Sequence, residues 1–210
     1  MKITLFGASG KSGQLILDQA LEKGCKVSAY VRRENAIERK DKNLEIFIGE
    51  LDEKEKIAQA LKGADVCISA LGGTSLKESV TQVIQGIDSI TSEMESQGIK
   101  RFLYLSSFGA GESKNYMAAI PRFLVVKILL KVPLADHNLN EERLQRSNLD
   151  WTVFRPGGLT DGPLSEKLKF GAEPTRVKGN PKISRASLAA FMLKQAADTT
   201  FNKKAIWLYE

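Results

Sequence analysis

The sequence of 210 residues contains only two cysteines and one histidine, which leaves few candidates for a metal centre. Cys25 and Cys67 lie within or next to expected strands and lack the spacing of metal ligands. We therefore predict that both are buried, reduced thiols and that the chain holds no metal. His137 directly precedes an expected helix, where it could be a structural side chain or a proton donor.

Long apolar runs are also missing. The most apolar stretch, residues 118–134, is interrupted by two prolines, two lysines and an arginine, whereas a membrane-spanning helix needs ~20 nearly uncharged residues. The stretch could instead be a helix packed on the core, a pocket wall or a self-association surface. The chain begins with a strand-like segment and shows no secretory h-region, so we expect a cytoplasmic protein that does not bind membranes.

A basic strip interleaved with aromatic residues is absent as well, although the formal net charge is +6. The lysines and arginines form short clusters and are scattered among 25 acidic residues. No helix-turn-helix pattern accompanies them. We therefore expect no nucleic-acid partner, and an anionic ligand explains part of the positive excess.

Apolar strand-like runs alternate with helix-like stretches along the whole chain. The expected strands are residues 2–6, 26–31, 44–48, 66–70, 102–105, 151–154 and 205–209, and the expected helices are residues 12–22, 53–61, 76–96, 123–130, 138–147 and 184–197. This alternation predicts an α/β fold: one doubly wound, mostly parallel sheet in the order 3-2-1-4-5-6-7, with helices on both faces. We expect a single domain over residues 1–210, with a small irregular excursion at about 157–182 above the carboxyl ends of the strands, where ligands bind.

Three glycines join the first strand to the first helix. In this pattern Gly7 permits a tight turn, Gly10 lets the backbone approach a pyrophosphate, and Gly13 lets the helix pack closely on the sheet. The pattern at this place predicts a Rossmann fold that binds a dinucleotide. A glycine-rich turn without a ligand is the alternative.

The start of the first helix supplies the anion-binding groups. The backbone N–H groups of Lys11 and Ser12 are the expected donors, aided by the helix dipole. The hydroxyls of Ser9 and Ser12 could add to them.

The end of the second strand bears on the choice between the two nicotinamide dinucleotides. NAD-binding proteins place an acidic residue here for the ribose 2′-hydroxyl, and NADP-binding proteins place an arginine for the 2′-phosphate. Arg32 and Arg33 occupy the position in this chain. The pair favours NADP(H) over NAD(H), because a guanidinium matches a phosphate. A solvated surface pair is the alternative.

Two further strand ends fit the path of the cofactor. Glu50 and Leu51 follow the third strand and should lie beside the adenine. Leu71 and Gly72 follow the fourth strand and should run along the ribose and pyrophosphate.

The fifth strand ends in Ser106 and Ser107, at the point that faces the nicotinamide in this topology. A hydroxyl there could orient the carboxamide or a substrate carbonyl, or the serines could simply cap the strand. The usual short-chain dehydrogenase activates a tyrosine with a lysine four residues later. Tyr116 is the only tyrosine shortly after the serines, and Ile120 occupies the lysine position. Alcohol oxidation by that route is therefore disfavoured.

These features together resemble the atypical short-chain dehydrogenase/reductases, over essentially the whole chain. The resemblance rests on the glycine loop, on residues 105–107, on Leu149-Asp150-Trp151-Thr152-Val153-Phe154-Arg155-Pro156-Gly157-Gly158 and on residues 182–193. The nearest group is the small NAD(P)H-binding proteins similar to biliverdin-IX-beta reductase/flavin reductase and to NmrA-like proteins.

The resemblance implies a single Rossmann domain that uses NADPH to reduce flavins, quinones or similar flat, conjugated small molecules. It implies that Ser107 lies beside the nicotinamide and that Pro156 belongs to a loop over that ring. We take Ser107 and Tyr116 as the catalytic candidates, and we expect Pro156 and Gly157 to bind the cofactor. Two positions depart from the flavin reductase pattern. Gly158 replaces a histidine, which leaves the substrate open, and Thr74 replaces a cofactor-contacting arginine.

A non-catalytic redox sensor of the NmrA type, which would bind NADP(H) and act through a protein partner, is the alternative function. It needs the same fold and the same glycine loop. The chain could be a monomer or a homodimer.

Overall fold

The computed structural model describes residues 1–72, 76–118 and 128–210 of the chain. Its centre is an eight-stranded sheet in the order β3-β2-β1-β4-β5-β6-β10-β8. The first seven strands in this order are parallel, and only β8 runs antiparallel to its neighbour β10. The strands of the sheet are β1 (Lys2–Phe6), β2 (Lys26–Val31), β3 (Leu44–Ile48), β4 (Val66–Ser69), β5 (Arg101–Leu105), β6 (Asp150–Pro156), β8 (Lys169–Gly171) and β10 (Lys204–Tyr209).

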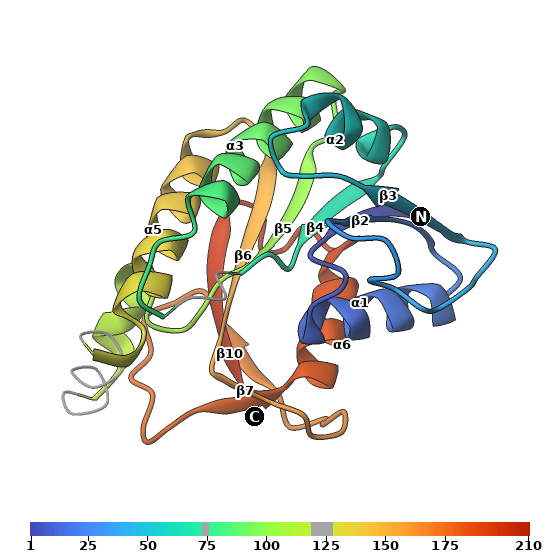
Figure 1. Ribbon diagram of the computed structural model, residues 1–210. Coiled ribbons are helices and arrows are strands. Elements are labelled where there is room, and N and C mark those ends of the chain that lie inside the picture. The colour runs from blue at the N-terminus through green and yellow to red at the C-terminus, as the bar shows by residue number, and fades with distance from the viewer. Residues whose placement is uncertain (73–75, 119–127) are drawn as a thin grey trace.

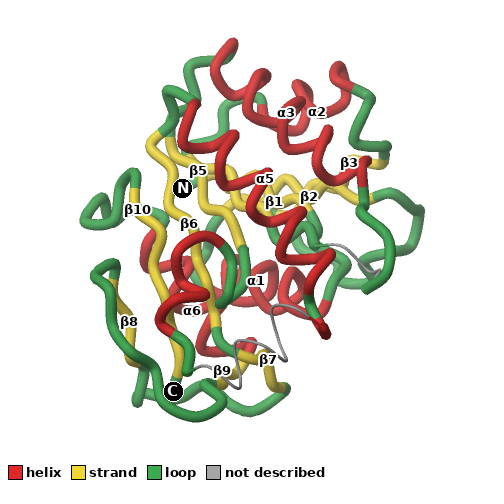
Figure 2. Tube along the Cα trace, turned by 90° about the vertical axis from the view of Figure 1, so that its left-hand side faces the viewer, coloured by secondary structure: helices red, strands yellow, loops and turns green. Residues whose placement is uncertain are grey.

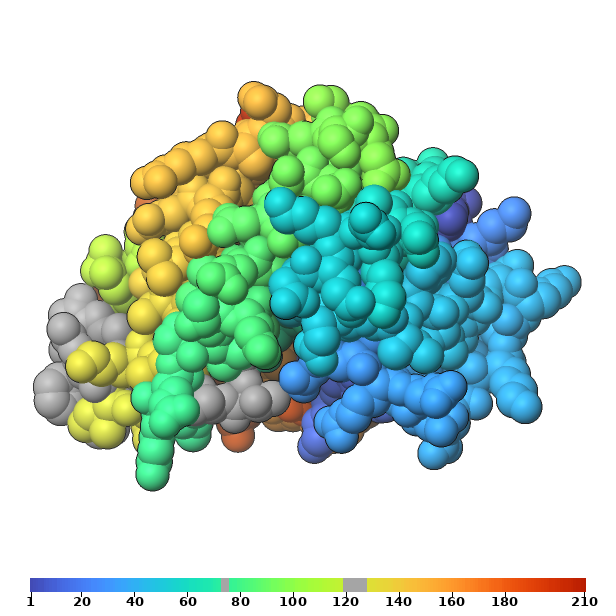
Figure 3. Space-filling view, turned by 45° about the horizontal axis from the view of Figure 1, so that its top comes forward, coloured from blue at the N-terminus to red at the C-terminus, as the bar shows by residue number. Residues whose placement is uncertain are grey.

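Helices cover both faces of the sheet (Figure 1). Helices α1 (Lys11–Glu22) and α6 (Arg185–Gln195) pack on one face, and α2 (Lys54–Leu61), α3 (Thr81–Ser96) and α5 (Lys131–Arg146) pack on the other. Figure 3 shows α2, α3 and α5 side by side across their face of the molecule. Each face has its own apolar core, because the side chains of β1, β4 and β5 alternate between the two helix layers.

The predicted fold class is confirmed, and all seven predicted strands lie in the predicted order. The excursion differs from the prediction, because it is not wholly irregular. It contributes the edge strand β8 and a separate parallel pair formed by β7 (Gly158–Thr160) and β9 (Lys182–Ser184). Figure 2 shows β8 beside β10 at one edge of the sheet, and the β7–β9 pair below it. Each of these strands has only three residues, too few to show an apolar alternation in the sequence.

Two predicted helix starts were wrong for identifiable reasons. The helix predicted from residue 76 begins at Thr81, because the Ser79 hydroxyl and the Val80 N–H both donate to the carboxylate of Asp136 on α5. The helix predicted from residue 138 begins at Lys131. Pro133 lies in its first turn, where the missing N–H would have no helical acceptor in any case.

Most of the helix predicted at residues 123–130 lies outside the described residues. Both cysteines are buried free thiols, as predicted. Among the described residues, no helix is long and apolar enough to cross a membrane, and no cluster of His, Cys, Asp and Glu could hold a metal ion.

Candidate functional site

The glycine loop has the geometry that the sequence predicts. Gly7 has φ +79°, and a Cβ added there would lie 2.7 Å from the carbonyl carbon of Ala70. A Cβ added to Gly13 would lie 2.0 Å from the carbonyl oxygen of Gly7. Side chains at either position would therefore force the backbone apart, since β1, its turn and α1 approach one another too closely for a methyl group.

Helix α1 begins at this loop with an open N-terminus. Its N-cap is Gly10, which has no side chain to accept from the first-turn N–H groups, and the first turn contains no acidic residue. The backbone N–H groups of Lys11, Ser12 and Gly13 have no hydrogen-bond acceptor within the described part of the chain. Unpaired N–H groups at the positive end of a helix dipole make this a site for an anion such as pyrophosphate.

A cavity of about 180 Å³ lies beside the glycine loop at the ends of β2, β3 and β4. Its lining includes the predicted residues Gly7, Ser9, Gly10, Arg32, Glu50, Leu51, Leu71 and Gly72. This is the expected place of the adenosine half of a dinucleotide. Arg33 is exposed and does not line the cavity, although the sequence placed it in the cofactor site with Arg32.

Tyr30 closes one wall of this smaller cavity. Its hydroxyl donates to the carbonyl oxygen of Glu50 at 2.7 Å, which ties the end of β2 to the end of β3. Burial, reinforced by the nearby carboxylates of Glu53, Glu50 and Asp52, raises the pKa of Tyr30 to about 12. The hydroxyl therefore stays protonated at neutral pH and serves as a fixed donor.

A second cavity of about 830 Å³ continues from the glycine loop over the ends of β5 and β6. Its lining includes the predicted residues Lys11, Ser12, Ser106, Ser107, Pro156 and Gly157. The two cavities share Gly10, Ala70, Leu71 and Gly72, so they form one path across the carboxyl ends of the strands. This arrangement places the α1 N-terminus in the middle of the path, between an adenosine end and a reacting end.

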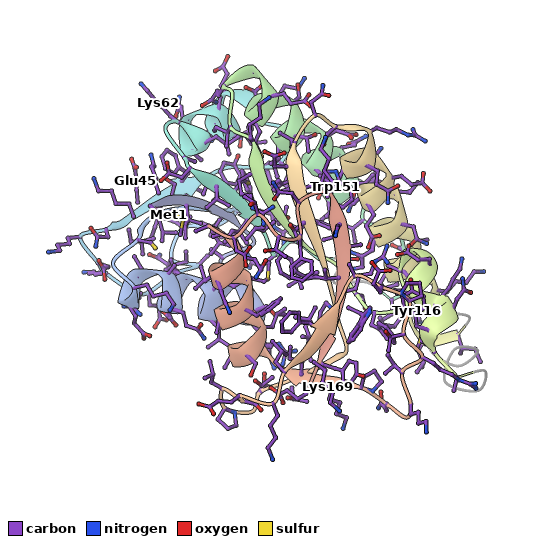
Figure 4. All side chains as sticks on the ribbon, turned by 180° about the vertical axis from the view of Figure 1, so that it is seen from behind. Met1, Glu45, Lys62, Tyr116, Trp151 and Lys169 are labelled. Atoms are coloured by element: carbon purple, nitrogen blue, oxygen red, sulfur yellow. The ribbon has the colours of Figure 1, made fainter. Side chains whose placement is uncertain are left out.

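Tyr116 does not belong to this arrangement, although the sequence placed it at the reacting end. It ends the short helix η1 (Gly111–Tyr116), and its neighbour Met117 lines the cavity instead. The backbone at Met117 is extended, so consecutive side chains point to opposite sides. Figure 4 shows Tyr116 on the flank of the molecule. Ile120 and Thr74 both lie outside the described residues.

A buried ionic cluster supports the floor of the larger cavity. Arg155 on β6 is 2% exposed, and its guanidinium contacts Glu141 at 2.5 Å and Glu112 at 2.6 Å. Burial alone would lower the pKa of Arg155, but hydrogen bonds to the two carboxylates raise it well above its ordinary value. Burial alone would likewise raise the pKa of Glu112, but its hydrogen bond to Arg155 lowers it overall. Glu141 also accepts from the Ser106 hydroxyl at 2.5 Å, so Ser106 is a fixed part of the wall.

Several lining residues were not predicted as site residues. His137 and Met117 line the larger cavity from the side of α5 and η1, and Asn180, Pro181 and Arg185 line it from the excursion and the start of α6. The excursion reaches the cavity because Gly157 lies against Pro181: a Cβ on Gly157 would lie 2.5 Å from the Pro181 carbonyl oxygen. In the sequence, the predicted position of the excursion above the strand ends is the signal for Asn180 and Pro181, and His137 was singled out only as a structural side chain or a proton donor.

Comparisons with known proteins agree with this geometry. The family model described as NAD(P)H-binding matches residues 7–199. The UPF0659 protein YMR090W of Saccharomyces cerevisiae is 26% identical over 205 residues, which cover 92% of this chain and 86% of the yeast protein.

Two solved structures have the same fold over the whole chain. One is ChuY, described as an anaerobillin reductase from Escherichia coli O157:H7, with TM-score 0.82, 26% identity and coverage of 100% of this chain and 97% of that one. The other is a short-chain dehydrogenase/reductase of Veillonella parvula in complex with NADP, with TM-score 0.81, 20% identity and coverage of 100% and 94%. The chain thus belongs to the NAD(P)H-binding family and is an oxidoreductase that uses a nicotinamide cofactor.

Proposed function

We propose that this oxidoreductase is an NADPH-dependent reductase that transfers a hydride to a flat, conjugated small molecule such as a flavin or a quinone. The observation that carries the proposal is the larger cavity. At about 830 Å³ it falls within the range of small-molecule sites, and it extends beyond the glycine loop to Ser107 and Pro156. Its wall includes Phe108, Met117 and Leu159, which suit the face of a conjugated ring.

The residues of the cavity position the reactants. NADPH supplies the hydride; the acceptor takes it on an electron-poor ring atom and takes a proton from water, leaving NADP⁺ and the reduced acceptor. The Ser107 hydroxyl is half-buried, and its one hydrogen bond in the described part of the chain is a long one of 3.5 Å to the adjacent Phe108 carbonyl. That hydroxyl is therefore free to orient the carboxamide or the acceptor. The sequence offers no Tyr–Lys pair after the serines, which suits an acceptor that needs no strong acid from the protein.

One similar protein supports the proposed reductase activity. The E. coli protein that shares the fold and 26% of the sequence is described as a reductase of anaerobillin.

The preference for NADPH over NADH rests on Arg32. It lines the smaller cavity, it is exposed, and it makes no ion pair with any described residue. An unpaired guanidinium at this place suits the 2′-phosphate of NADPH. The carboxylate of Glu50 is the only one from the described residues that lines this cavity, and it is the candidate for a ribose hydroxyl.

Arg32→Ala tests the preference, with Arg33→Ala as the matched control. We expect Arg32→Ala to raise the KM for NADPH at least 10-fold and to leave the KM for NADH within about 2-fold, since a lost charge-assisted hydrogen bond is worth about 1.5–3 kcal/mol. Arg33→Ala should change neither constant. Equal effects of Arg32→Ala on both cofactors would refute the assignment of the 2′-phosphate.

Steady-state oxidation of NADPH tests the activity itself. FMN, riboflavin and a 1,4-quinone should each be supplied as acceptor, with NADH in parallel. Saturable turnover that favours NADPH is the expected result. Tight binding of NADPH without turnover on any acceptor would overturn the reductase assignment and point to the redox sensor, which acts through a protein partner.

A further inference from the structure

The larger cavity contains the only histidine of the chain, and its imidazole is held from behind by a buried hydrogen-bond relay. The side-chain amide of Asn140 donates to the hydroxyl oxygen of Tyr104 at 3.0 Å. That oxygen lies 2.8 Å from Nδ1 of His137. Tyr104 is fully buried on β5, while His137 and Asn140 lie one turn apart on α5, so the sheet and the helix fix all three groups.

The relay decides which nitrogen of His137 carries the proton. A tyrosine hydroxyl has a single proton, and its oxygen already accepts from Asn140. Among the described residues, the Tyr104 hydroxyl has two hydrogen-bond partners, and the amide of Asn140 is a donor, so Nδ1 of His137 is the remaining acceptor for the Tyr104 proton and is then unprotonated. Burial lowers the pKa of His137 to about 4, against a smaller opposing effect of Asp136, so the ring is neutral at pH 7. A neutral ring that accepts at Nδ1 carries its proton on Nε2.

The Nε2 atom is the part of the ring that can meet a ligand. It has no hydrogen-bond partner among the described residues, and it is not one of the buried polar atoms that lack a partner. His137 lines the cavity together with Ser107 and with the apolar side chains of Met117 and Leu130. The hydroxyl of Ser107 and the N–H of His137 are thus polar groups in a largely apolar wall. Such a wall suits a flat molecule with one polar edge.

We propose that His137 is a neutral hydrogen-bond donor to an oxygen of the acceptor, and that the acceptor is a conjugated carbonyl compound. The inference rests on the proposed reductase function. When hydride adds to the conjugated system, its electron pair moves to the carbonyl oxygen, and the Nε2–H of His137 stabilises the resulting negative charge. Water then protonates that oxygen, because neutral imidazole does not give up its remaining proton at pH 7. Tyr104 is a positioning residue, since it acts only through His137.

The tautomer can be read directly, because a sample labelled with ¹⁵N-histidine reports a single side chain. Long-range ¹H–¹⁵N NMR spectra at pH 7 should show a pyrrole-like Nε2 and a pyridine-like Nδ1. Tyr104→Phe should mix the two tautomers while the protein stays folded. The opposite tautomer in the wild-type protein, with the proton on Nδ1, would overturn the proposal.

Kinetics with a 1,4-quinone test the role of the donor. His137→Leu should lower kcat/KM for the quinone about 10- to 100-fold, the scale of a lost oxyanion donor in a partly open site. His137→Gln, which can place an amide N–H near the position of Nε2, should restore most of that loss, whereas His137→Asn should not. All three variants should bind NADPH within about 2-fold of the wild type, which shows that the fold and the cofactor site are intact.

The outcomes separate the two proposals. A wild-type protein that binds NADPH but turns over none of the acceptors contradicts the proposed function. A wild-type protein that reduces the quinone while His137→Leu reduces it equally well contradicts only the role of His137.

Discussion

Gly10→Ala should abolish tight cofactor binding while leaving the fold intact. Gly10 has an ordinary extended backbone with φ −77° and ψ 160°, and an added Cβ would lie 3.4 Å from its nearest neighbour, the Gly7 carbonyl oxygen. The residue lines both cavities, at the point where the path of the dinucleotide crosses the α1 N-terminus. The methyl group would therefore occupy space that the pyrophosphate needs, without opening the loop.

The effects of Gly10→Ala on stability and on cofactor affinity can be estimated separately. Alanine restricts the unfolded chain, which stabilises the folded protein by about 0.4–1 kcal/mol. Alanine is also a poorer N-cap than glycine, which costs a similar amount. The free energy of unfolding should therefore change by less than about 1 kcal/mol. A phosphate held away from one backbone N–H loses about 1.5–3 kcal/mol. The Kd for NADPH should therefore rise about 10- to 100-fold for each lost hydrogen bond.

Gly13→Ala is the comparison variant, because it should destabilise the fold itself, which Gly10→Ala should not do. A Cβ on Gly13 would lie 2.0 Å from the Gly7 carbonyl oxygen, so α1 must shift and the unfolding free energy should fall by about 1–3 kcal/mol or more. Titration calorimetry with NADPH and denaturant unfolding of the cofactor-free protein would measure both quantities. Unchanged NADPH affinity in a folded Gly10→Ala protein would refute the placement of the pyrophosphate at this loop.

Three further predictions concern the cavity floor and its side chains. Arg155→Met should lower the unfolding free energy by about 3–5 kcal/mol in urea titrations, because it leaves the carboxylate of Glu141 buried without a cation; an unchanged midpoint would contradict this. Ser107→Ala should lower kcat/KM for the acceptor and leave the Kd for NADPH within about 2-fold; a selective rise in that Kd would assign the hydroxyl to the cofactor alone. The pKa of His137 falls from 6.5 in the unfolded chain to about 4 in the fold, so its contribution to stability is present above pH 6.5 and lost as the pH falls towards 4. Between pH 7 and pH 4, the unfolding free energy of the wild type should fall by up to about 3 kcal/mol more than that of His137→Gln. An equal fall in the two proteins would disprove this.

The sequence predicted most of the site because the motifs of this fold are local. The glycines, the first turn of α1, Arg32 and the two serines each follow a strand directly, and parallel strands bring their carboxyl ends to one edge. A residue within two or three positions of a strand end could therefore be placed without knowing any long-range contact. Fourteen of the predicted site residues line the joined cavities, namely Gly7, Ser9, Gly10, Lys11, Ser12, Arg32, Glu50, Leu51, Leu71, Gly72, Ser106, Ser107, Pro156 and Gly157.

The predictions failed where a residue's position depends on packing between distant segments. Tyr116 was placed near the serines by its distance along the chain, but the extended backbone after η1 brings Met117 to the cavity instead. The start of α3 was missed because Asp136, more than fifty residues away, takes the hydrogen bonds of Ser79 and Val80. The apolar periodicity of a sequence cannot predict a contact between segments so far apart.

The sequence by itself determined the fold class, the order of the seven predicted strands and the position of the glycine loop, since strand and helix periods and glycine spacing are properties of neighbouring residues. Only the tertiary structure decided what surrounds the reacting end. It placed Arg155 between two carboxylates from different segments and packed Tyr104 of β5 against His137 of α5. The physical reason is that buried polar groups must find partners, and in a parallel sheet covered by helices those partners come from elements far apart in the chain.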